Sequence, residues 1–196
     1  MIPVEASDLN TLVIEVERQT AEVEDLFGSL EEEAKGWRSG PTTWSIAAHV
    51  AHLCIVNGAY VEALDSCVRQ AGAKDITGDG PYRHPWLAKW FSRSMEPPPK
   101  PRLKTAKKMI PDPNAEAGST LAEFVQLQSE WLRLMSAARG LDLGKARFSS
   151  PFLRLLRLSL GTGFAVILAH NRRHLWLIRE VMRHPDFPRS ASGSGI

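Results

Sequence analysis

The C-terminal part of the chain contains two histidines one helical turn apart, His170 and His174, in the segment FAVILAHNRRHLWLIREV. Side chains four residues apart lie on one face of a helix, with Cβ atoms about 5–6 Å apart, so two imidazoles can converge on one metal ion. A metal site also needs a third ligand from another helix. The segment WSIAAHVAHLC offers His49 and His52. We expect a three-histidine site if these segments are neighbours in the fold.

Burial in an ordinary core is the alternative explanation of such a pair, because a neutral histidine with one hydrogen bond is tolerated there. Three histidines brought together without a metal would repel one another on protonation, so convergence of three favours a metal. His52 is the expected third ligand. We expect His49 to pack or hydrogen-bond beside the site, and the alternative is that His49 replaces His52 as the ligand.

Helical periodicity dominates the sequence, and no segment sustains the period of two that is typical of strands. Apolar stripes predict four long helices, over residues 7–35, 45–70, 120–139 and 162–183. We expect Ser7 and Ser45 to cap the first two, with Trp44 packing over the start of the second. Thr120 and Glu123 form a candidate capping box for the third. The face of the first helix opposite its stripe is acidic and includes Glu15.

A stretch rich in Pro and Gly, residues 72–118, separates the second and third helices and has room for one short helix in PWLAKWFSRSM. It either links two domains or crosses between helices of one domain. The crossover is favoured, because neither pair of helices could bury its stripe alone. We therefore predict an all-α four-helix bundle with a long crossover between helices 2 and 3. We expect residues 1–188 to form a single domain and residues 189–196 to form a disordered tail. We also expect Trp86 and Trp90 to cover the metal cavity.

The composition is that of an ordinary globular chain, with 196 residues, 43% hydrophobic residues and a net charge of +2. The near balance of charge gives no global drive toward nucleic acid or membrane, and we expect neither as a partner. A nucleic-acid role for the basic stretch 81–108 remains the alternative. Cys54 and Cys67 are about 20 Å apart along one helix and cannot bridge each other, which favours reduced thiols and a cytoplasmic location.

Several motifs in order resemble the DinB-like (DinB/YfiT) superfamily of bacterial four-helix proteins. A histidine, His52, stands eight residues after Trp44, and a C-terminal H-x-x-x-H is followed by an aliphatic helix end and the pair Phe187 and Pro188. The resemblance extends over nearly the whole chain, from the first helix to HPDFP. It departs from the family at Leu177, where many relatives have glutamine.

The resemblance implies that His52, His170 and His174 hold one divalent metal, zinc or nickel, inside the bundle. Three protein ligands leave coordination positions open, as in catalytic sites. Some branches of the superfamily activate a low-molecular-weight thiol for S-transfer or isomerisation, and others are described as metal-dependent hydrolases. We therefore expect hydrolysis or transfer on a small-molecule substrate. The alternative is a non-enzymatic stress-response or binding module with a structural or vestigial metal. Helical bundles of this size commonly dimerise, so we expect a homodimer.

Overall fold

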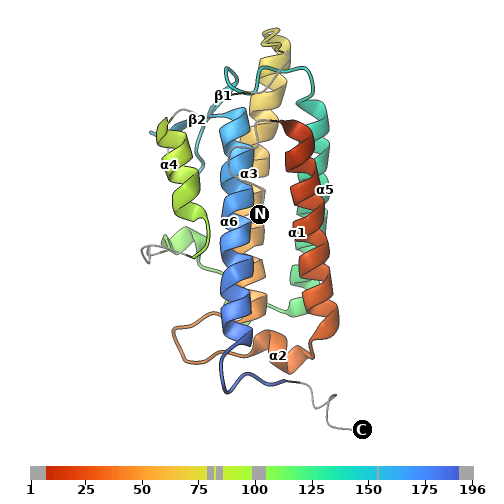
Figure 1. The fold of residues 1–196 in the computed structure, drawn as a ribbon, viewed down its shortest axis with the longest axis vertical. Coiled ribbons are helices and arrows are strands. Elements are labelled where there is room, and N and C mark those ends of the chain that lie inside the picture. The colour runs from red at the N-terminus through yellow and green to blue at the C-terminus, as the bar shows by residue number, and fades with distance from the viewer. Residues whose placement is uncertain (1–7, 79–81, 83–85, 99–104, 154, 190–196) are drawn as a thin grey trace.

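The computed structural model describes residues 8–78, 82, 86–98, 105–153 and 155–189, with only the backbone for residues 86–89 and 91. Four long helices dominate these residues and lie side by side (Figure 1). They are α1 (Leu9–Ser29), α3 (Ile46–Ala73), α5 (Ala117–Ala137) and α6 (Leu160–Met182). The shorter elements are α2 (Glu32–Gly36), α4 (Trp86–Met95), the 3₁₀ helix η1 (Lys107–Met109), β1 (Arg147–Ser149) and β2 (Arg157–Ser159).

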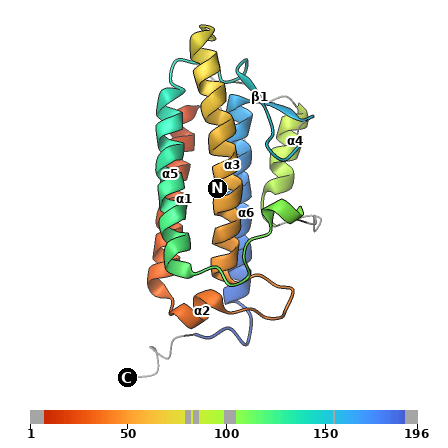
Figure 2. The ribbon, with the colours of Figure 1, turned by 180° about the vertical axis from the view of Figure 1, so that it is seen from behind.

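Each long helix contacts two others: α3 and α1 both pack against α5 and α6. The prediction of an all-α chain is confirmed in its broad form. The crossover after α3 does contain a short helix, α4, which packs along α6 on the outside of the four long helices (Figure 1). After α4 the chain passes η1, which contacts α3, and then runs across to the start of α5 (Figure 2). The crossover therefore lies against the two helices that carry the histidines.

The helix starts follow local hydrogen bonding, and one predicted cap is wrong. The Ser45 hydroxyl oxygen accepts the amide of Ala48 at 3.1 Å, as predicted. Asp8 caps α1, and Ser7 lies outside the described residues. At α5 the Glu116 carboxylate accepts the first amides of the helix, whereas the Thr120 hydroxyl donates to the Glu116 carbonyl oxygen at 2.6 Å. Thr120 is thus inside the helix, because an acidic side chain one turn earlier already satisfies the free amides.

The link before α6 contains a strand pair that the sequence did not predict. β1 and β2 pair antiparallel, with Phe148 opposite Leu158. Both of these side chains are buried, while Arg147 and Arg157 are exposed. Each strand has only three residues, so the alternation is too short to register as a period. The hairpin ends at Ser159, whose hydroxyl oxygen caps α6.

Two apolar clusters fill the interior, one at each end of the four long helices. At the boundary between them each long helix contributes one buried amide side chain: Gln19, Asn57, Gln128 and Asn171. The Asn57 amide nitrogen donates to the Asn171 amide oxygen at 3.0 Å. A buried hydrogen bond of this kind disfavours sliding of α3 past α6, since a shift would take the donor away from the buried Asn171 oxygen. It therefore fixes the relative height of the two histidine-bearing helices.

The prediction that Glu15 lies on the face of the first helix opposite its apolar stripe is wrong. Its side chain is 2% exposed and forms an ion pair with Arg172 of α6 at 2.8 Å. Arg172 also pairs with Glu96, just after α4. One guanidinium group thus joins α1, α6 and the end of α4. The position follows from helical geometry, because a residue one turn from Leu12 and next to Val16 shares the edge of their buried stripe.

α3 is also long and apolar enough to cross a membrane, but 61% of its most apolar window is buried inside the structure. The apolar residues of α3 are explained by its packing against α5 and α6. Cys54 and Cys67 are buried and free, in agreement with the expectation of unbridged thiols.

Candidate metal centre

The structure brings together the three histidines expected to bind a metal. His52 of α3 and His170 and His174 of α6 each offer one ring nitrogen, and these three atoms lie within 4.8 Å of one another. The Nε2 atoms of His52 and His170 are 3.3 Å apart. Among the described residues, no Asp, Glu or Cys joins this group.

Trp44 covers one side of the cluster. Its ring centroid lies 5.0 Å from that of His52, 5.3 Å from that of His49 and 6.1 Å from that of His174. The cap at Ser45 begins α3 directly after this tryptophan, so the indole lies over the first turns of the helix. The expectation that Trp90 roofs the cavity is wrong, since that side chain is 66% exposed, and the Trp86 side chain lies outside the described residues.

A backbone carbonyl orients His52. Its Nδ1 lies 2.6 Å from the carbonyl oxygen of Met109 in η1. A carbonyl oxygen only accepts hydrogen bonds, so Nδ1 must carry the proton and donate. The lone pair of His52 is then on Nε2, the atom that faces His170. An outer hydrogen bond of this kind is typical of metal-binding histidines, because it fixes both the tautomer and the ring orientation.

His49 lies beside the group and does not belong to it. Its Nδ1 is 3.0 Å from Nδ1 of His174. The prediction that His49 would hydrogen-bond beside the site is confirmed. If His174 presents Nε2 to a metal, its Nδ1 carries a proton and donates to the bare Nδ1 of His49. His49 would then fix the tautomer and the ring orientation of His174, as the Met109 carbonyl does for His52.

Burial holds these histidines in the neutral form. For His49, burial and then the charge of His52 lower the pKa from 6.5 to about 4. For His170, burial lowers the pKa to about 3, helped by the charges of His52 and Arg173. The pKa of His174 is also well below 6.5, mainly through burial. Neutral imidazoles are the form that binds metal, so the cluster is ready for a cation at neutral pH.

The donor set fits a divalent ion. Two imidazole nitrogens bound to tetrahedral zinc at about 2.0–2.1 Å would be about 3.3–3.4 Å apart. The separation between His52 and His170 matches this value at 3.3 Å. With Nδ1 of His52 protonated, the metal-free alternative needs His170 to donate from Nε2 across this long contact. The buried Nδ1 of His170 has no hydrogen-bond partner among the described residues.

Other polar residues near the site differ in what they can do. Arg173, next to His174, is half-buried, and its charge acts on the pKa of both α6 histidines. Three carboxylates of the long helices have other surroundings: Glu62 is exposed, Glu130 pairs with Arg133, and Glu180 pairs with Arg183.

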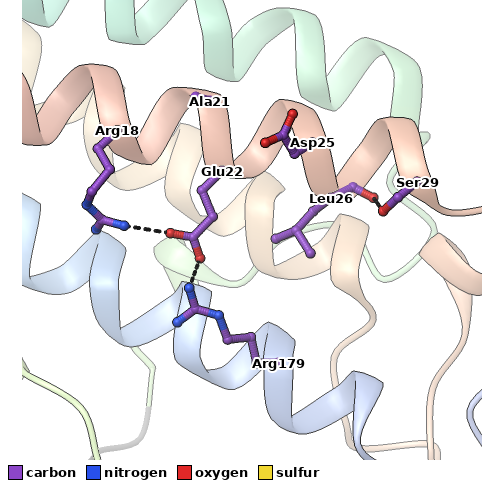
Figure 3. A pocket seen from close by; sticks show the side chains of 7 residues that line it. All are labelled: Arg18, Ala21, Glu22, Asp25, Leu26, Ser29 and Arg179. Atoms are coloured by element: carbon purple, nitrogen blue, oxygen red, sulfur yellow. Dashed lines mark hydrogen bonds and ion pairs between the residues drawn. The ribbon is translucent and has the colours of Figure 1, made fainter.

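A separate groove between α1 and α6 has a volume of about 610 Å³ and is open to solvent (Figure 3). None of the histidines lines it. Glu22 crosses the groove and forms ion pairs with Arg18 of α1 and Arg179 of α6. Both of its arginines are thus paired with Glu22, and its lining residues are Arg18, Ala21, Glu22, Asp25, Leu26, Ser29 and Arg179.

The fold and the site define a mostly helical protein with a three-histidine group that could hold a metal ion. Residues 15–178 match the DinB superfamily, and the chain belongs to that superfamily. No curated protein matches the chain, and neither does any solved structure. Family and histidine cluster together fit a metal-binding DinB-like protein.

Sequence reasoning missed two groups at this centre. The Met109 carbonyl carries no side-chain signature, so only the path of the crossover could reveal it. Arg173 had a signal, because it stands beside His174 in HNRRH and no acidic residue occurs between Asp142 and Glu180. The predicted residues lie together because α3 and α6 are neighbours, which was the condition set by the sequence.

Proposed function

We propose that the protein is a metal-dependent enzyme in which His52, His170 and His174 hold one divalent ion, zinc or nickel. The ion would activate water or a small thiol for hydrolysis or group transfer on a small molecule. The observation that carries this proposal is the group of three neutral imidazoles whose ligand atoms lie within 4.8 Å of one another.

No Asp, Glu or Cys from the described residues joins this group, and this bears on the chemistry. A divalent ion held by three neutral imidazoles is a strong Lewis acid that lowers the pKa of a water or thiol in an open position. The protein's own groups would orient this centre. Met109 and His49 fix the rings of His52 and His174, and Trp44 shields one side from water.

The wider architecture is proposed on the same grounds. The packing of α1, α3, α5 and α6 supports a four-helix bundle with the crossover between its second and third helices. We propose a single domain over residues 1–188, a cytoplasmic location and a homodimer. A low-molecular-weight thiol is the proposed cosubstrate, and we propose neither nucleic acid nor membrane as a partner.

Metal analysis of protein purified without an affinity tag tests the proposal. We expect about one zinc or nickel per chain, and loss of that metal in His52→Ala and His170→Ala. His184→Ala is the matched control, because His184 lies after α6 and its ring packs on Trp37, away from the cluster. Absence of metal from the wild-type chain, even after incubation with zinc or nickel, would sink the proposal.

Cobalt substitution separates the enzyme from its alternative. An open site should bind azide or a thiol and change the visible spectrum of the cobalt protein. A structural metal would show no such change, and His52→Ala would then lower the melting temperature sharply. The second outcome would favour a non-enzymatic module, which the leucine at position 177 also suits.

A further inference from the structure

Arg173 is the basic side chain that lies nearest in sequence to both α6 histidines without a carboxylate partner. It is half-buried, between α6 and the end of α4, and its Nη1 donates to the carbonyl oxygen of Ser94 at 3.4 Å. Among the described residues, Arg173 forms no other hydrogen bond and no ion pair. Nε and Nη2 are therefore left without protein acceptors in that part of the chain.

The neighbouring residue, Arg172, does have carboxylate partners, so the lack of a partner at Arg173 depends on the face of α6 that the side chain occupies. Arg172 pairs with Glu15 and Glu96. Glu15 is further engaged by Arg18 at 2.8 Å. Both carboxylates that reach α6 at this level are thus already used, and they lie on the side of the helix away from His170 and His174, since two residues correspond to about 200° of rotation.

No Asp or Glu from the described part of the chain joins the three histidines, and the helix η1 next to them is basic. The described segment beside His52 is η1, which carries Lys107 and Lys108 and no Asp or Glu. Its Met109 carbonyl touches His52. A divalent ion on three neutral imidazoles would therefore lie close to the half-buried guanidinium of Arg173 and to the basic helix η1. Like charges at low dielectric repel strongly, so the loaded centre favours anionic ligands.

We propose that the substrate or cosubstrate of this centre is a small organic anion and that Arg173 binds its carboxylate group. This inference rests on the proposed function, because it names the class of molecule that the same site accepts. A carboxylate matches the two parallel N–H groups of a guanidinium, and a partly buried arginine with no protein carboxylate has that fork available.

The groove of Figure 3 is a poorer candidate for the same anion. Its two arginines, Arg18 and Arg179, already share Glu22, so a bound anion would have to displace a protein carboxylate. Arg173 has no such competitor among the described residues. The comparison also provides a control, because Arg179 lies on the same helix and carries the same charge.

Two thiols that differ in charge test the inference on the full-length protein loaded with cobalt. Mercaptoacetate carries a carboxylate, and 2-mercaptoethanol is neutral, while both can bind the metal through sulfur. The thiolate-to-cobalt charge-transfer band reports binding of each. The variants are Arg173→Gln, Arg173→Lys and the control Arg179→Gln, and circular dichroism verifies that each is folded.

The Kd of 2-mercaptoethanol divided by the Kd of mercaptoacetate measures the preference for a carboxylate. This ratio should be about tenfold higher for the wild type and for Arg179→Gln than for Arg173→Gln, as expected for one charge-assisted hydrogen-bonded contact. Arg173→Lys should retain part of the preference, because it keeps the charge and loses the fork. An Arg173→Gln protein with the wild-type preference overturns the inference and leaves the metal centre intact. Absence of cobalt bands before any thiol is added overturns the proposed function and this inference together.

Discussion

α6 carries two polar clusters on opposite faces, and they are built in opposite ways. On one face Arg172 pairs with Glu15 of α1 and with Glu96 after α4, so a mostly buried cation is matched by one buried and one half-buried carboxylate. On the other face His170 and His174 meet His52, and no carboxylate among the described residues joins them. In the first cluster the charge of the arginine is balanced by carboxylates of the protein itself. The second consists only of neutral donors.

This difference separates a structural role from a binding role. Breaking a buried ion pair leaves an uncompensated charge and is strongly destabilising, so the Arg172 cluster holds three elements together. Neutral imidazoles with lowered pKa values add little to folding, but they bind a cation without first losing a proton. We therefore expect changes in the two clusters to have separable effects: on stability at the Arg172 cluster, and on metal affinity at the histidines.

The largest expected effect is on stability and comes from Arg172→Met. The change leaves Glu96 without Arg172, and Glu15, which is 2% exposed, with only Arg18 and Gln19. We expect the free energy of unfolding to fall by about 3–5 kcal/mol, measured by urea denaturation of the metal-free protein. Zinc content should stay at the wild-type level. Loss of zinc from the folded variant would mean that the two clusters are coupled.

The two clusters should affect the free energy of unfolding over different ranges of pH. Burial opposes ionisation of Glu15, but hydrogen bonds from Arg18, Arg172 and Gln19 outweigh it and hold the pKa at about 2, below its usual 4.5. The stability from this carboxylate is present above pH 4.5 and is lost as the pH falls toward 2. His49 behaves differently: its folded pKa is about 4 instead of 6.5, so below pH 6.5 the unfolded chain takes up a proton that the folded chain refuses.

Metal-free protein should therefore lose stability in two overlapping windows: from pH 6.5 down to about 3 through the buried histidines, and from 4.5 to about 2 through Glu15. The slope for one group is about 1.4 kcal/mol per pH unit. Glu15→Gln should flatten only the loss in the lower window, and His49→Leu should reduce the loss in the upper one. Urea denaturation at a series of pH values measures both. A Glu15→Gln protein that keeps the wild-type loss in the lower window would contradict the assignment.

His49→Leu should weaken metal binding with a smaller effect on the fold. His174 would lose the partner 3.0 Å from its Nδ1, and the loss of such outer hydrogen bonds typically lowers metal affinity by about 10–100-fold. Competition with a chromophoric chelator measures the affinity. His49→Asn is the matched variant: its amide oxygen can replace the lost acceptor, so it should retain most of the affinity. Equal losses in both variants would argue against the hydrogen bond as the cause.

The sequence predicted the features that depend on residues close together in the chain. The three histidines of the cluster were predictable from short stretches of sequence: the turn between His170 and His174, and the count from Trp44 to His52 that resembles the family. Periodicity predicted the four long helices for the same reason. The cap of α3 at Ser45 was also correct, since capping involves residues only one turn apart.

The remaining features depend on contacts between distant segments. Glu15 looks like its exposed acidic neighbours until Arg172, far along the chain, lies opposite it. The Met109 carbonyl reaches His52 only because the crossover runs across α3. The cap at Glu116 was missed although it is local, because glutamate is not among the preferred capping residues.

The smallest expected effect comes from Arg133→Met, which is the matched test of burial for the Arg172 cluster. Arg133 also pairs with two carboxylates, Glu130 at 2.7 Å and Asp65 at 3.1 Å, but its side chain is 53% exposed. Water screens these charges in both the folded and the unfolded chain, so the pairs add little. The melting temperature of Arg133→Met should equal that of the wild type within error by differential scanning calorimetry. A loss as large as that of Arg172→Met would show that the number of ion pairs, and not their burial, decides the stability of this fold.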